Sequence, residues 1–89
     1  MLIIGEIFYM VNLTFNSSDE FKNYLNSTNE KDFALDTTSM NIFESLKFLV
    51  LSSAFFYQKY PQEKLKCKIK SDEIKSLIST FEVKNLEFV

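Results

Sequence analysis

Hydrophobic and polar residues alternate along several short stretches of the chain, a pattern typical of β-strands with one buried face. The alternation is clearest over residues 31–36 and 64–70, and it also marks a strand from about Ile7 to Phe15. A further short strand is expected over residues 86–89. The side chains expected to face the core are Val11, Leu13, Phe15, Phe33, Leu35, Leu65, Cys67, Ile69, Leu86 and Phe88.

Between these strands, apolar residues recur every three or four positions, which predicts three amphipathic helices. Each helix is expected to start at a residue that favours the N-cap position. These residues are Ser17, with Glu20 at the spacing of a capping box, Asn41, with Glu44 in the first turn, and Ser71. Carboxylates in the first turn also suit the positive end of a helix dipole.

The middle helix, from about Ile42 to Lys59, has apolar residues around most of its circumference. Such a helix is usually covered on most sides, so we expect it to be largely buried. One apolar stripe is formed by Ile42, Leu46, Leu49, Ser53 and Phe56, and it is widened by Phe43, Val50, Ala54 and Tyr57.

The element order β-α-β-α-β-α-β predicts an α/β fold with a small mixed or parallel four-stranded sheet, because helical crossovers connect parallel strands. Strands covered on both faces would have continuous apolar runs, whereas these strands alternate. We therefore expect the helices mainly on one face, with Asp32 and Asp36 near the lysines of residues 64–70 on the solvated face. We expect residues 1–89 to form a single domain, in which residues 1–10 are an extra strand or a loose N-terminus.

Composition and charge narrow the range of functions. The formal net charge is −2, which gives no positive field to attract nucleic acid. Histidine is absent, which removes the commonest general base and zinc ligand. We therefore expect no catalysis, no cofactor, no bound metal and no nucleic-acid partner.

The sequence also indicates the cellular compartment of the protein. A single cysteine, Cys67, forms no internal disulfide and suits a reducing cytoplasm. The apolar runs are too short to span a bilayer, and the N-terminal run lacks the features of a signal peptide. We expect a cytoplasmic protein without a membrane span.

Three groups of residues could carry chemistry. The lysines at positions 64, 66, 68 and 70 fit an anion- or RNA-binding face less well than a solvated sheet face that resists edge pairing. Thr37, Thr38 and Ser39 precede a helix start that could hold an anion, although such residues more often cap and turn. Cys67 alternates with core residues, which indicates an inert buried thiol.

Two segments of the chain resemble the STAS domain, which is found in anti-sigma factor antagonists and in the tails of sulfate transporters. Phe33-Ala-Leu-Asp-Thr-Thr-Ser-Met-Asn-Ile-Phe-Glu-Ser-Leu46 is similar to the strand and loop that lead into the central helix of that family. The segment Ser71 to Leu86 is similar to its closing helix and the turn into the last strand. The resemblance covers about residues 11–89 and implies a regulatory interaction domain without catalysis.

The chain departs from the family at the phosphorylation motif. Members that act as phospho-switches carry Asp-Ser-Ser-Gly at the start of the central helix, and aligned on Leu46 that motif falls on residues 42–45. The phosphorylatable serine becomes Glu44 and the glycine becomes Ser45. A carboxylate at this position is not a kinase substrate, although it resembles a modified state.

These observations together predict a protein-interaction domain that docks another protein through the loop and helix start at residues 37–45. Loops that follow the carboxyl ends of strands are where α/β sheets usually bind ligands. Two alternatives are left open: a small-ligand or anion site at the same helix start, and a self-assembling subunit or homodimer that uses the region of Phe55 and Tyr57 or a free sheet edge. The residues expected to contact the partner are Thr37, Thr38, Ser39, Met40, Asn41, Glu44 and Ser45.

Overall fold

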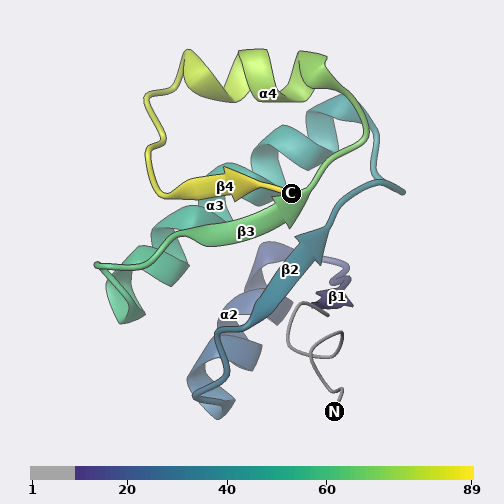
Figure 1. Cartoon of the computed structure of the whole chain (residues 1–89). Coiled ribbons are helices and arrows are strands. Elements are labelled where there is room, and N and C mark those ends of the chain that lie inside the picture. The colour runs from purple at the N-terminus through teal and green to yellow at the C-terminus, as the bar shows by residue number, and fades with distance from the viewer. Residues whose placement is uncertain (1–9) are drawn as a thin grey trace, which may run out of the picture.

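The computed structural model describes residues 10–89, in which four parallel strands alternate with three helices (Figure 1). This order confirms the predicted α/β class and shows that the sheet is parallel throughout. The part of the first predicted strand before Met10, and the extra strand considered for residues 1–10, lie almost wholly outside the described residues. The elements are β1 (Val11–Leu13), α2 (Ser18–Ser27), β2 (Phe33–Asp36), α3 (Ile42–Lys59), β3 (Leu65–Lys68), α4 (Asp72–Ser79) and β4 (Leu86–Phe88).

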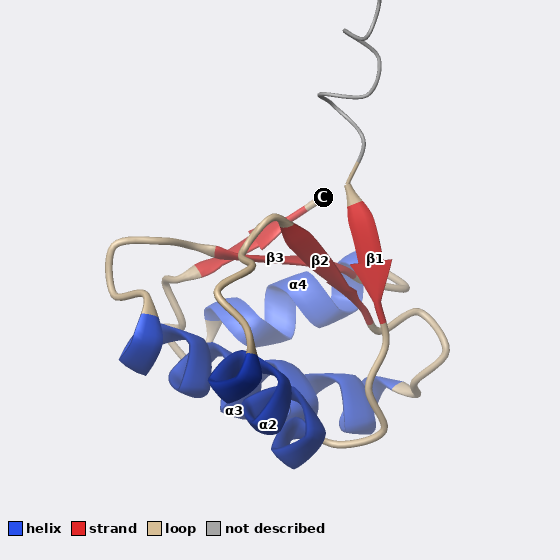
Figure 2. Ribbon diagram, turned by 90° about the horizontal axis from the view of Figure 1, so that it is seen from below, coloured by secondary structure: helices blue, strands red, loops and turns tan. Residues whose placement is uncertain are grey.

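The strands lie in the sheet in the same order as in the sequence, β1-β2-β3-β4. Each helix therefore connects two neighbouring strands, and every connection steps across the sheet in the same direction. Because such connections are almost always right-handed, all three helices fall on one face. Figure 2 shows this two-layer arrangement, with the helices gathered on one side of the sheet.

The strand register separates a core face from a solvated face. Leu35 pairs with Leu13 and Cys67, and Cys67 pairs with Phe88, so one row of apolar side chains crosses all four strands. On the opposite face, Asp36 lies in register with Lys68, which places a carboxylate beside the lysine row as expected.

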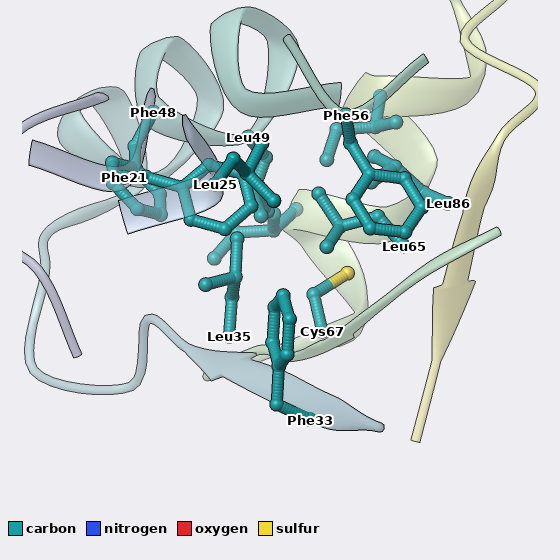
Figure 3. Close-up of a cluster of buried hydrophobic side chains, with 12 residues drawn as sticks. Phe21, Leu25, Phe33, Leu35, Phe48, Leu49, Phe56, Leu65, Cys67 and Leu86 are labelled. Atoms are coloured by element: carbon teal, nitrogen blue, oxygen red, sulfur yellow. The ribbon is translucent and has the colours of Figure 1, made fainter. Parts of the chain in front are cut away.

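Phe33 on β2 is the centre of the aromatic core. Its ring packs edge-on against Phe21 and Tyr24 of α2, with centroids 6.0 and 5.6 Å away, and against Phe56 of α3 at 6.5 Å. One strand side chain thus ties two helices to the sheet. Other buried side chains in the same cluster, most of them labelled in Figure 3, are Leu25, Leu35, Phe48, Leu49, Leu65, Cys67, Ile74, Ile78 and Leu86.

The expectation that α3 is buried on most sides is wrong. Phe43 is 76% exposed and Tyr57 is 57% exposed, and Ala54 lies on the same outward side. The three helices form a single layer in which α2 and α4 flank α3, so among residues 10–89 nothing covers its outer face. The inward face carries Ser45, Phe48, Leu49, Ser52, Ser53 and Phe56.

The helix starts follow the sequence prediction with two differences. The Ser17 hydroxyl accepts a hydrogen bond from the N–H of Glu20 at 3.2 Å, but the Glu20 carboxylate accepts from Asn16 instead of Ser17, so the capping box is half formed. Ser71 occupies the N-cap of α4 without a side-chain cap hydrogen bond. At the other end of α2, the Lys59 ammonium donates to the main-chain carbonyls of Leu25 and Thr28, which complements the negative end of that helix.

The lengths and hydropathies of the helices bear on membrane insertion. Within the described part of the chain, no helix is both long enough and apolar enough to cross a bilayer.

Candidate functional site

A cleft of about 700 Å³ lies between the start of α2 and the part of α3 from Glu44 to Phe55. Its apolar lining consists of Phe15, Met40, Phe48, Leu51 and Phe55. Its polar lining consists of Asn16, Ser17, Ser18, Asp19, Ser39, Glu44 and Lys47. Seven of these twelve lining residues are polar, so the cleft is a mixed polar and apolar surface, as protein interfaces commonly are.

The position of the cleft follows from the sheet topology. The chain leaves β1 toward α2 and leaves β2 toward α3, and because the two strands are parallel neighbours, both loops lie at the same edge of the sheet. This is the carboxyl-terminal edge, where α/β folds generally bind their ligands.

Hydrogen bonds hold the loop between β2 and α3 in a defined shape. The Asp36 carboxylate accepts from the main-chain N–H and the hydroxyl of Thr38, at 2.9 and 2.6 Å. Thr37 donates its N–H and its hydroxyl to the carbonyl of Lys68, both at 3.0 Å, and its own carbonyl accepts from the N–H of Met40. Both threonine hydroxyls are therefore engaged inside the loop, and the loop is fixed to β3.

A complete capping box starts α3. The Asn41 amide oxygen accepts from the N–H of Glu44 at 2.8 Å, and the Glu44 carboxylate accepts from the N–H of Asn41 at 3.1 Å. The carboxylate of Glu44 already complements the positive end of the helix dipole. An external anion would have to compete with it, so the geometry favours the anion-binding alternative less than the sequence did.

The structure separates the predicted contact residues into accessible and buried ones. Ser39, Met40 and Glu44 line the cleft, and Asn41 lies exposed beside them. Thr38 is half-buried, whereas Thr37 and Ser45 are fully buried. In this conformation Thr37 and Ser45 present no surface to a partner.

Sequence reasoning missed the α2 side of the cleft, from Asn16 to Asp19, and the α3 residues Lys47, Leu51 and Phe55. These residues can be recognised only when the order of the strands in the sheet is known. Once neighbouring parallel strands are assumed for residues 11–15 and 33–36, the loops that follow them must meet at one edge. From the sequence alone, Ser17 is expected only to cap a helix and Phe55 only to belong to a self-association surface.

Two titratable groups have shifted pKa values. The hydrogen bonds from the hydroxyl and the N–H of Thr38, together with the positive charge of Lys68, lower the pKa of Asp36, although partial desolvation opposes them. Burial raises the pKa of the Cys67 thiol to about 12, so at neutral pH it is not a thiolate nucleophile.

Among residues 10–89, the side chains of His, Cys, Asp and Glu form no group of three or more that could hold a metal ion.

Known proteins offer no guide to the site. Comparisons with protein families, curated proteins and solved structures gave no match. The geometry of the cleft is therefore the basis for a function.

Proposed function

We propose that this chain is a non-catalytic, STAS-like regulatory domain of the cytoplasm that docks a partner protein in the cleft between α2 and α3. The observation that carries the proposal is the composition of the cleft, in which five apolar and seven polar side chains line one surface at the carboxyl-terminal edge of the sheet. Segment 37–45 contributes Ser39, Met40 and Glu44 to it. Cytoplasmic placement is supported by the one buried, free thiol of Cys67.

The fixed shape of the loop supports docking. Asp36, Thr37 and Thr38 hold the loop through hydrogen bonds within the chain, so little conformational entropy remains to be lost when a partner binds. Preorganisation of this kind raises affinity without adding contacts.

The cleft also indicates the chemistry of the partner segment. Asp19 and Glu44 add two carboxylates to the polar lining, and Lys47 adds one ammonium. A segment that places apolar side chains against Phe15 and Leu51, and a basic side chain toward the two carboxylates, would complement this surface.

Affinity capture with a matched pair of variants tests the proposal. Leu51 lines the cleft and is 39% exposed, whereas Leu77 on α4 is 36% exposed and lies outside the cleft. We expect a protein captured from the native cytosol by the wild type and by Leu77→Lys to be lost with Leu51→Lys. Circular dichroism establishes that both variants are folded. If both variants retain the same proteins, the cleft is not the docking site.

A small-molecule site is the second candidate, because about 700 Å³ lies within the range of ligand pockets. In that case a ligand raises the melting temperature of the wild type and of Leu77→Lys but not of Leu51→Lys, since binding to the native state alone stabilises it. A ligand-screening experiment with these three proteins distinguishes the two candidates.

A further inference from the structure

An apolar stripe runs along the outer face of α3, formed by Phe43, Val50, Ala54 and Tyr57. Phe43, Val50 and Tyr57 are spaced by seven residues, and Ala54 lies one turn before Tyr57. A seven-residue repeat keeps side chains on one side of a helix and is the repeat with which two helices pack along their length. The stripe therefore has the periodicity of a helix-helix contact, although no second helix of residues 10–89 covers it.

The two faces of α3 differ from those of an ordinary surface helix. The face against the sheet contains the buried hydroxyl side chains Ser45, Ser52 and Ser53, whereas the outer face exposes two aromatic rings. Exposed apolar patches of this kind mark interaction surfaces.

The outer face also has a knob and a hollow at opposite ends. The knob is Phe43, which is 76% exposed in the first turn. The hollow measures about 610 Å³ and lies toward the carboxyl end of the helix. It is lined by Val50, Ser53, Ala54 and Tyr57 together with the segments 61–64 and 82–85. At 1.5 Å per residue, Phe43 and Tyr57 are about 21 Å apart along the helix axis. A two-fold axis across α3 near Val50 brings the knob of each copy to the hollow of the other.

We propose that the outer face of α3 is a homodimer interface, in which the α3 helices of two copies pack antiparallel and Phe43 of each contacts Ala54 and Tyr57 of the other. Such an interface is isologous, with the same patch used by both copies. This dimer interface is distinct from the cleft of the proposed function, because the cleft is lined by other residues of α3, such as Phe48 and Phe55.

The exposed area fits a weak dimer. Aromatic side chains bury about 150–250 Å² each, so covering the exposed parts of Phe43 and Tyr57 in both copies removes roughly 400–650 Å². That is about a third to a half of the roughly 1,200 Å² at the lower end of stable interfaces. Val50, Ala54 and the walls of the hollow add to it, so we expect a reversible, concentration-dependent dimer.

Sedimentation velocity of the full chain, from about 10 µM to about 1 mM, is the first test, since weak interfaces dissociate in this range. The expected result is a shift from monomer to dimer with increasing concentration. Phe43→Glu should weaken the dimer at least about tenfold, as expected for an aromatic residue that anchors an interface. Val89→Glu is the matched control, because Val89 is 58% exposed and lies outside both α3 and the hollow. A wild type that stays monomeric, or a dimer equally affected by both variants, would overturn the proposal.

The antiparallel arrangement has a test of its own. Phe43→Glu and Tyr57→Lys should each weaken self-association, and an equimolar mixture of the two variants should form a heterodimer. In that heterodimer the new carboxylate faces the new ammonium on one side, and the native Phe43–Tyr57 contact is kept on the other. Both positions are exposed, so folding is retained and circular dichroism verifies it. Failure of the mixture to associate better than either variant alone would overturn the antiparallel pairing.

Discussion

The side chain of Glu44 accepts a hydrogen bond from the main chain of Asn41, and the side chain of Asn41 accepts one from the main chain of Glu44. Each residue thereby satisfies an N–H group that the first turn of α3 leaves without a helical partner. In the alignment with STAS phospho-switches that we propose, Glu44 stands in place of their serine, and in this chain it has a structural task.

Substitution of Asn41 tests the capping box. Asn41→Ala removes the acceptor for the N–H of Glu44 and should lower the free energy of unfolding by about 1 kcal/mol, the usual cost of a lost N-cap. Asn41→Asp keeps an acceptor oxygen and should be close to neutral. Urea denaturation of the three proteins measures both differences. Equal stability of the two variants would mean that the box is not formed in solution.

Replacing buried serines should make the protein more stable. The hydroxyls of Ser45 and Ser52 are buried and have no hydrogen-bond partner among residues 10–89. Burying an unpaired hydroxyl costs about 1–3 kcal/mol, and alanine is also the better helix former. Ser45→Ala should therefore raise the free energy of unfolding by about 1–2 kcal/mol.

The matched control is Ser76→Ala, at an exposed position within α4. It should show only the difference in helix propensity, about 0.5 kcal/mol or less. Thermal or chemical denaturation compares the two variants. A loss of stability in Ser45→Ala would show that its hydroxyl is hydrogen-bonded in the folded protein.

The fold was predictable because its signals are local. Alternation around Phe33 and Leu35, and around Leu65 and Cys67, follows from the two-residue repeat of a strand, and the same residues face the core in the structure. The side chain of Asn41 acts on N–H groups a few residues away, so its capping role can be recognised without knowledge of the rest of the chain.

Burial around α3 and the full extent of the cleft were not predictable in the same way. An apolar pattern shows that burial of Phe43 and Tyr57 would be favourable, but not whether this chain provides something to cover them. Asp19 and Glu44 line one cleft although 25 positions separate them, because the sheet brings two loops to the same edge. Such neighbours depend on strand order, which the sequence alone left undetermined.

Cys67 should be inert in the native protein. It is fully buried, and burial raises the pKa of its thiol to about 12. We expect iodoacetamide at about pH 8 to label it only after unfolding, since the thiolate is the reactive form. Labelling of the native protein at the rate of the unfolded chain would contradict the burial.

The same pKa shift predicts how stability changes at alkaline pH. The pKa of the Cys67 thiol is higher in the folded than in the unfolded state. The contribution of this thiol to the free energy of unfolding is therefore fully present below the unfolded pKa of about 8.5, and it is lost as the pH rises toward the folded value. The free energy of unfolding of the wild type, minus that of Cys67→Ala, should fall by about 1.4 kcal/mol per pH unit above about pH 8.5. Other titrating groups are common to both proteins and cancel in this difference.

The contribution of Asp36 to stability should have the opposite dependence on pH. Its pKa is lowered in the folded state, so its contribution to stability is present above the unfolded pKa of about 3.9 and is lost as the pH falls through the folded value. The difference in the free energy of unfolding between the wild type and Asp36→Asn should therefore be larger at neutral pH than at about pH 2.

The hydrogen bond from the Thr38 hydroxyl is the largest cause of the lowered pKa of Asp36, followed by the bond from the Thr38 N–H, and Lys68 contributes less. Thr38→Val keeps the N–H donor and removes the hydroxyl, so it should raise the pKa of Asp36 toward its ordinary value. Lys68→Met should raise it by a smaller amount. An NMR titration of the Asp36 carboxyl carbon in the three proteins measures these shifts directly. A larger effect from Lys68→Met than from Thr38→Val would mean that charge, and not the hydrogen-bonded loop, holds this carboxylate in its ionised form.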